Sequence, residues 1–286
     1  MDQEPLRTAL VYDFDGTLAR GNVQEHSLLP ELGISKDDFW AEVKRRTEEH
    51  DADEILVYMD YMLECARAVE HPVTRAALQE HGRDVPLFAG LDSWFDRIDA
   101  YGRERGLAVE HYIVSSGNQE LIEGSAIASR FERIFASRFM FDEAGEAFGP
   151  GLAINYTNKT QFLFRINKGI ENCWDNAAVN RWMPLAERPV PFSRMIFYGD
   201  GETDIPSMKM VRHQGGYSIA VFDPDSFSED RSQGKIHRLI SEDRVHYVAP
   251  ADYRRGHLLD VVTRGVLGRI AREEGWRDGA DKAGGG

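Results

Sequence analysis

Two acidic segments of the chain, DFDGTL at residues 13–18 and GDGETD at residues 199–204, each come at the end of a short apolar run. Such runs, here residues 8–14 and 194–198, are typical of buried β-strands. The carboxyl ends of parallel strands form the ligand-binding edge of an open sheet, so both segments are expected there. Four carboxylates at one edge would repel one another without a divalent cation, and Mg²⁺ prefers oxygen ligands. The acids that could hold such an ion are Asp13, Asp15, Asp200 and Asp204.

A phosphate site is indicated between these two segments. Residues 113–117, Ile-Val-Ser-Ser-Gly, predict a strand end and then a helix start, which together suit an anion. Gly16 permits a tight turn that brings backbone N–H groups towards a bound anion. A helix start is also predicted at residues 157–160, Thr-Asn-Lys-Thr, which places Lys159 at the same edge.

Lys168 competes with Lys159 for this place. It lies on the same predicted helix at roughly 180° around the axis, so the two lysines cannot face one pocket. We favour Lys159, because the N-terminus of the helix is the end that meets the ligand-binding edge of the sheet.

The predicted strands that position these residues alternate with helices along the chain, except in one long stretch that has no strand pattern. Residues 19–88 have helical periodicity without a strand pattern: Ser35 and Asp38 resemble a capping box, and Pro72 opens a further helix. Beyond residue 88, helices and strands alternate, which predicts right-handed crossovers and a mostly parallel sheet covered on both faces. The predicted fold class is therefore α/β, with a three-layer Rossmann-like core and a helical cap domain inserted after the first strand.

The alternation also sets the expected boundaries. The later strands are predicted at residues 111–115, 134–141, 194–198 and 218–222, and the main helices at 91–105, 118–128, 161–170, 206–211 and 258–274. We expect the α/β core to comprise residues 1–18 and 89–278, the cap residues 19–88, and a disordered Gly-rich tail residues 279–286.

Net charge and composition limit the classes of partner that the protein is expected to bind. The chain has 286 residues, with 34 Lys and Arg against 48 Asp and Glu, for a formal charge of −14. Such a chain repels phosphate backbones and anionic lipid, so neither nucleic acid nor a membrane surface is expected as a partner. The acidic start lacks the basic residues of a signal peptide, and the two distant cysteines exclude a disulfide framework. A cytoplasmic location is expected, and the oligomeric state is left open.

Taken in order, the segments DFDGTL, IVSSG, NKT and GDGETD resemble the haloacid dehalogenase superfamily, in particular its phosphoserine-phosphatase-like phosphatases, over about residues 8–222. The resemblance implies a Mg²⁺-dependent phosphatase. Asp13 would be the nucleophile that forms an aspartyl-phosphate, and Asp15 the general acid and then base. Mg²⁺ would be held by Asp200 with Asp13 and the Asp15 backbone carbonyl, and Asp204 would orient its ligands. The phosphoryl group would be bound by Gly16, Thr17, Ser115, Ser116, Gly117 and Lys159.

The residue two positions after the nucleophile separates reaction classes within the superfamily. Its dehalogenases lack an acid there and its ATPases carry Thr, so Asp15 favours a phosphatase. Two alternatives stay open: a phosphotransferase or phosphomutase, and a phosphoryl-binding regulator without catalysis.

The substrate is expected to be a small phosphorylated metabolite. Phosphoserine phosphatases carry a substrate-reading Glu nine residues after the nucleophile, where this chain has Asn22, so phosphoserine is disfavoured. Polar cap residues that could read another substrate are Arg20, Asn22, Glu25, His26, Arg45 and Arg46.

Overall fold

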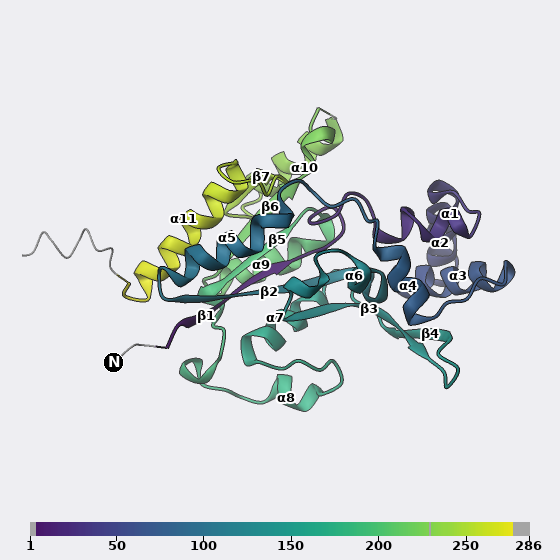
Figure 1. The fold of residues 1–286 in the computed structure, drawn as a ribbon, viewed down its shortest axis with the longest axis horizontal. Helices are drawn as coiled ribbons and strands as arrows, with labels where there is room; N and C mark the ends of the chain where they lie inside the picture. Colours follow the sequence, from purple (N-terminus) through teal and green to yellow (C-terminus); the bar gives the residue numbers. More distant parts are fainter. Residues whose placement is uncertain (1–3, 229, 277–286) are drawn as a thin grey trace, which may run out of the picture.

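A computed structural model describes residues 4–228 and 230–276 and has a seven-stranded sheet at its centre (Figure 1). The strand order is β4-β3-β2-β1-β5-β6-β7, and every neighbouring pair is parallel except β3 with β4. The strands are β1 (Leu6–Tyr12), β2 (Leu107–Asn118), β3 (Arg133–Phe141), β4 (Ala147–Leu152), β5 (Met195–Gly199), β6 (Tyr217–Phe222) and β7 (Tyr247–Pro250). The predicted α/β class with a mostly parallel sheet is confirmed.

Strand β1 lies in the middle of the sheet because its residues are apolar on both faces. Leu10 and Tyr12 belong to one buried hydrophobic cluster, and Ala9 and Val11 belong to another. This alternation places one cluster on each face of the sheet. Tyr12 pairs with Ile113 of β2 and with Tyr198 of β5, so the residues that follow these three positions lie side by side.

Helices cover both faces and complete the three layers (Figure 1). The first cluster includes buried residues of α5 and α11, and the second includes those of α7 and α9. The helices outside the insertion are α5 (Leu91–Arg103), α6 (Gln119–Gly124), α7 (Lys159–Lys168), α8 (Asn176–Asn180), α9 (Ile205–His213), α10 (Asp230–Ser241) and α11 (Leu258–Glu273).

The segment between β1 and α5 forms helices, as predicted, and these lie together at the right of Figure 1. They are η1 (Val23–Glu25), α1 (Leu28–Glu31), α2 (Lys36–His50), α3 (Glu54–Ala68) and α4 (Arg75–Gly82). The predicted cap at the start of α2 is present, because the Ser35 hydroxyl accepts a hydrogen bond of 3.1 Å from the Asp38 N–H.

Helix α4 packs closely on α6 of the core. A Cβ atom added to Gly82 would lie 1.9 Å from the Leu121 carbonyl oxygen, and one added to Gly124 would lie 1.9 Å from that of Gln79. Buried residues of the insert, such as Phe39 of α2, belong to the same hydrophobic cluster as Leu10 of β1. That residues 19–88 form a cap domain of their own stays a prediction.

Sequence reading missed some elements and misplaced some ends. Strands β4 and β7 and helices α8 and α10 were not predicted. Strand β2 runs on to Asn118 rather than ending at Ser115, and the helix predicted at 118–128 is the shorter α6. A bulge between Ser115 and Asn118 keeps the strand pairing while it turns the intervening residues. The expected tail at 279–286 lies outside the described residues. Within the described part of the chain, no helix has the length and hydropathy needed to cross a membrane.

Candidate active site

A cavity of about 970 Å³ opens where β1, β2 and β5 end, between the sheet and helices α2 and α3. The predicted site residues that line it are Asp13, Asp15, Gly16, Asn22, Ser115, Ser116, Gly117, Lys159 and Asp200. Residues far apart in the sequence thus share one cavity, because the central strands of the sheet end there.

Lys159 lies at the base of this cavity, between two carboxylates. Helix α7 begins at this residue, and its Nζ lies 3.0 Å from Asp13 Oδ1 and donates to Asp204 Oδ1 at 2.7 Å. All three side chains are buried. Burial disfavours the charged lysine, but the two carboxylates outweigh that effect and raise its pKa. Lys159 is therefore a fixed positive charge next to Asp13.

The single positive charge of Lys159 does not neutralise the negative charges of the carboxylates around it. Burial and the charge of Asp204 raise the pKa of Asp13 to about 7, although Lys159 acts in the opposite direction. Burial also raises the pKa of Asp200; the positive charge of Lys235 opposes this shift, and the charge of Asp204 adds to it. The site is one in which added positive charge would stabilise the ionised carboxylates.

Asp15 is held in a different environment from Asp13. Its Oδ1 accepts a hydrogen bond of 2.9 Å from the Val23 N–H at the start of the insert. A Cβ atom added to Gly117 would lie 2.6 Å from its Oδ2, so a side chain larger than hydrogen at residue 117 would displace this carboxyl group. Burial, followed by the charge of Asp13, raises its pKa well above the ordinary value. A protonated carboxyl group of this kind can act as a general acid.

Three carboxylates fit a hard divalent cation. Asp13, Asp200 and Asp204 each offer an oxygen, and these atoms lie within 4.8 Å of one another. Two glycines allow this approach: a Cβ atom at Gly16, where φ is +73°, would lie 2.5 Å from Asp200 Cγ, and one at Gly199 would lie 2.4 Å from Asp204 Oδ2. An all-oxygen set suits Mg²⁺. The role predicted for the Asp15 backbone carbonyl stays a prediction.

The end of β2 offers hydroxyl groups beside these acids. Ser115 Oγ accepts a hydrogen bond of 3.1 Å from the Gly117 N–H. Ser116 Oγ is buried and has no hydrogen-bond partner among the described residues, while the Ser116 carbonyl accepts a bond of 3.0 Å from the Tyr58 hydroxyl. The Ser116 hydroxyl is therefore available to a ligand. Thr17 is buried but does not line the cavity.

Other predicted residues lie away from the cavity. Lys168, at the far end of α7, donates to the carbonyl oxygens of Val179 and Arg181. Arg20 forms ion pairs of 2.7 Å with Asp223 and 2.8 Å with Asp225.

Glu25 lies behind the cavity wall and orients two residues that line it. It accepts hydrogen bonds of 2.6 Å from the Asn22 amide and 2.7 Å from the Trp40 indole. Of the six polar residues expected to read the substrate, Asn22 lines the cavity, and the other five do not: Arg20, Glu25, His26, Arg45 and Arg46.

The sequence did not predict two features of this region: Lys235 and three aromatic side chains that line the cavity. Lys235, on α10, places its Nζ 3.2 Å from Asp200 Oδ2. Apolar residues at helical spacing in 236–240 could have indicated α10, but no local motif links it to Asp200. The aromatic side chains Trp40, Tyr58 and Tyr156 line the same cavity as the acids.

The fold and the site together define an α/β enzyme with a buried carboxylate–lysine centre at the edge of its sheet. Residues 10–209 match the family model of the haloacid dehalogenase-like hydrolases, and the chain belongs to this family. The resemblance found from the four sequence segments is thereby confirmed.

Relatives with solved structures share the fold. A HAD family hydrolase from Salmonella enterica serovar Typhi has a TM-score of 0.54 and 16% identity, over 92% of this chain and 72% of that one. A probable phosphoserine phosphatase from Vibrio cholerae has a TM-score of 0.55 and 14% identity, over 96% of this chain and 70% of that one. An uncharacterized protein of Borreliella burgdorferi is 25% identical in an alignment of length 275, which covers 87% of this chain and 92% of that protein.

Proposed function

We propose that the protein is a Mg²⁺-dependent phosphatase that hydrolyses a small phosphomonoester through an aspartyl-phosphate on Asp13. The observation that carries the proposal is the position of Asp13: it lies in a cavity 3.0 Å from the buried Lys159, with Asp15 lining the same cavity. A carboxylate nucleophile divides a slow hydrolysis into two easier steps.

The two steps use the two acids of the first segment. In the first, an Asp13 oxygen forms a bond to phosphorus while the bond to the leaving oxygen breaks, and Asp15 donates its proton to that oxygen. In the second, Asp15 takes a proton from water, the water oxygen bonds to phosphorus, and Asp13 is released. The raised pKa of Asp15, which burial causes, supports its role as the acid of the first step.

The surrounding charges stabilise the transferring group. Lys159 is fixed by Asp204 and offers its charge to the phosphoryl oxygens, and the hydroxyl groups of Ser115 and Ser116 add donors. Asp13, Asp200 and Asp204 would hold Mg²⁺, which when bound supplies further positive charge to the phosphoryl group. Electrostatic stabilisation of this kind accounts for most of the acceleration in phosphoryl transfer.

The cavity wall favours a leaving group that is larger than serine and carries a ring. Trp40, Tyr58 and Tyr156 line it together with Ile55, and the indole of Trp40 is held by Glu25. Aromatic side chains bind planar groups by offset stacking or edge contacts. We therefore propose an aryl or heterocyclic phosphomonoester, such as a nucleoside monophosphate, as the substrate class.

Phosphate release from a panel of esters tests this function. With Mg²⁺, the pure protein should turn over ring-bearing esters faster than phosphoserine, and EDTA should abolish turnover. Trp40→Ala should lower kcat/KM for the preferred ester by roughly 10–100-fold, as expected for the loss of one aromatic contact, with little change for a small alkyl phosphate. Transfer of phosphate to an added alcohol would favour the phosphotransferase instead, and phosphate binding without any turnover would favour the regulator.

A further inference from the structure

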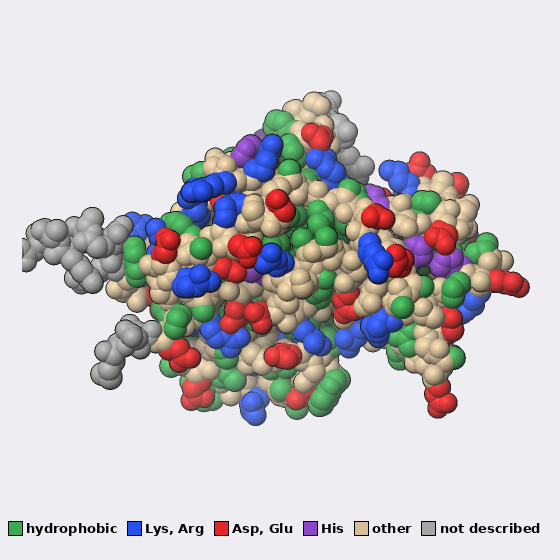
Figure 2. Space-filling view, in the orientation of Figure 1, with side chains coloured by type: hydrophobic (Ala, Val, Ile, Leu, Met, Phe, Trp, Pro, Cys, Tyr) green, Lys and Arg blue, Asp and Glu red, His purple; other side chains and the backbone are tan. Residues whose placement is uncertain are grey.

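A second group of possible metal ligands lies on the insert, outside the active-site cavity. Glu31 ends α1, His71 lies between α3 and α4, and His81 belongs to α4. Each offers one ligand atom, and these atoms lie within 4.8 Å of one another. None of the three lines the cavity described above. Figure 2 shows histidine side chains next to a carboxylate on the surface of the insert, at the right of the view.

Both histidine side chains are largely withdrawn from solvent. Their side chains are 12% and 8% exposed, and their ring centres lie 5.4 Å apart. His71 turns Nε2 towards Glu31, while its Nδ1 is buried without a hydrogen-bond partner among the described residues.

The separations agree with a tetrahedral ion. His71 Nε2 lies 3.2 Å from Glu31 Oε1, and His81 Nδ1 lies 3.8 Å from Glu31 Oε2. With bonds of about 2.0–2.1 Å, the ligands of tetrahedral Zn²⁺ are separated by roughly 3.3 Å. Ser27 Oγ, 2.8 Å from His81 Nδ1, lies near enough for it or a water molecule to complete the set.

We propose that Glu31, His71 and His81 form a Zn²⁺ site that is separate from the Mg²⁺ site of the cavity. Two imidazoles and one carboxylate suit Zn²⁺, whereas Mg²⁺ prefers oxygen ligands alone. The ion would connect α1 and the α3–α4 connection to α4, and α4 is packed against α6 of the core. Its role is to hold the first part of the insert on the core, and it takes no part in the chemistry.

Zn²⁺ binding by the full chain, measured by equilibrium dialysis in excess Mg²⁺ to saturate the aspartate site, tests the proposal. We expect one Zn²⁺ per chain, and at least tenfold weaker binding in His71→Ala, in His81→Ala and in the milder Glu31→Gln. His50→Ala, which changes an exposed histidine at the end of α2, is the matched control and should bind as the wild type does. Co²⁺ substitution should give a tetrahedral absorption spectrum that His71→Ala abolishes.

Two outcomes would overturn the proposal. One is a wild-type chain that binds no Zn²⁺ under these conditions, in which case the three residues form only a hydrogen-bonded contact. The other is Zn²⁺ binding that Asp200→Asn removes and the histidine variants keep, which would place the ion in the cavity. Glu31 is largely exposed, so Glu31→Gln separates ligand loss from misfolding if the histidine variants fold poorly. The readout does not depend on phosphatase activity.

Discussion

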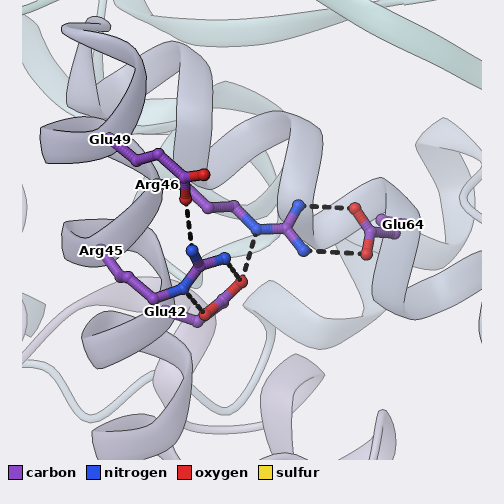
Figure 3. A network of polar contacts seen from close by, with 5 residues as sticks. All are labelled: Glu42, Arg45, Arg46, Glu49 and Glu64. Carbon is purple, nitrogen blue, oxygen red and sulfur yellow. Dashed lines mark hydrogen bonds and ion pairs between the residues drawn. The ribbon is translucent and has the colours of Figure 1, made fainter.

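The cavity has two walls whose charged groups differ in burial. On the sheet side, Asp13, Lys159 and Asp204 are buried, and glycines at 16 and 199 let the acids approach closely. On the insert side, α2 and α3 are joined at the surface by a network of ion pairs among Glu42, Arg45, Arg46, Glu49 and Glu64 (Figure 3). Buried groups with fixed partners keep one geometry, whereas exposed ion pairs adjust to their surroundings.

The ion pairs of the two walls also differ in how much their loss would destabilise the protein. Arg46 contacts Glu42 at 2.7 Å within α2 and Glu64 at 2.6 Å on α3. Exposed pairs of this kind contribute about 0–1 kcal/mol each. Removal of one partner from a buried pair costs about 3–5 kcal/mol, because an uncompensated charge is left behind. The comparison predicts that the sheet side, where we propose the chemistry takes place, tolerates little change, while the insert side can vary with the substrate.

The largest effect is expected at the nucleophile. Asp13→Asn should abolish turnover, because an amide cannot attack phosphorus, and Asp15→Asn should reduce it by about 10²–10⁴-fold through the loss of the general acid. Steady-state phosphate release measures both, and ³²P retained on the acid-quenched wild type but not on Asp13→Asn would locate the intermediate. Near-normal turnover by Asp13→Asn would refute the covalent mechanism.

The second-largest effect is expected at Lys159, and the other lysine of α7 serves as its control. Lys159→Met should lower kcat by about 10²–10³-fold, the usual cost of removing one preorganised charge, and should also destabilise the metal-free fold by leaving Asp13 and Asp204 without a cation. Lys168→Met, at the exposed end of the same helix, is the control and should retain activity. Comparable losses in both variants would mean that Lys159 has no special place in the site.

The third effect is a pH dependence of metal binding. In the metal-free protein, the pKa of Asp13 is raised from 3.8 to about 7, so between these values the folded state holds more protons than the unfolded state. Stability from this group therefore falls as pH rises through that window. Because Mg²⁺ binds the carboxylate, its affinity should rise by up to about tenfold per pH unit there.

Thermal melting with and without Mg²⁺ from pH 5 to pH 8 measures this dependence. The gain in Tm from Mg²⁺ should be larger at pH 8 than at pH 5, and Asp13→Asn should lose most of that difference. A gain that is equal at all pH values in the wild type would contradict the assignment of Asp13 as a ligand.

The smallest effect is expected in the insert network. Arg46→Gln should change the free energy of unfolding by less than about 1 kcal/mol and leave turnover of a small phosphate ester unchanged, because neither Arg46 nor Glu64 lines the active-site cavity. Urea denaturation and the phosphate-release assay test the two parts. A loss of activity as large as that of Lys159→Met would show that the two walls are not independent.

Much of the site could be predicted because its signals are local. Asp13 and Asp15 follow an apolar run within a few residues, and the start of α7 at Lys159 is visible in the Asn-Lys-Thr segment. Strand type and strand ends follow from such patterns, and the parallel topology then brings the ends of β1, β2 and β5 together. The confirmed fold class and family depend on these short-range signals.

The tertiary structure decided what lies around the acids. Lys235 reaches Asp200 because α10 packs against β6, the strand next to β5. Trp40 lines the cavity with its indole hydrogen-bonded to Glu25, which lies 15 residues away in the sequence. Arg20, which the sequence placed among substrate contacts, is instead paired with Asp223 on a distant loop. A side chain on a surface helix has several neighbours within reach, and the packing of the whole chain selects among them, whereas a carboxylate at a strand end is placed by the strand itself.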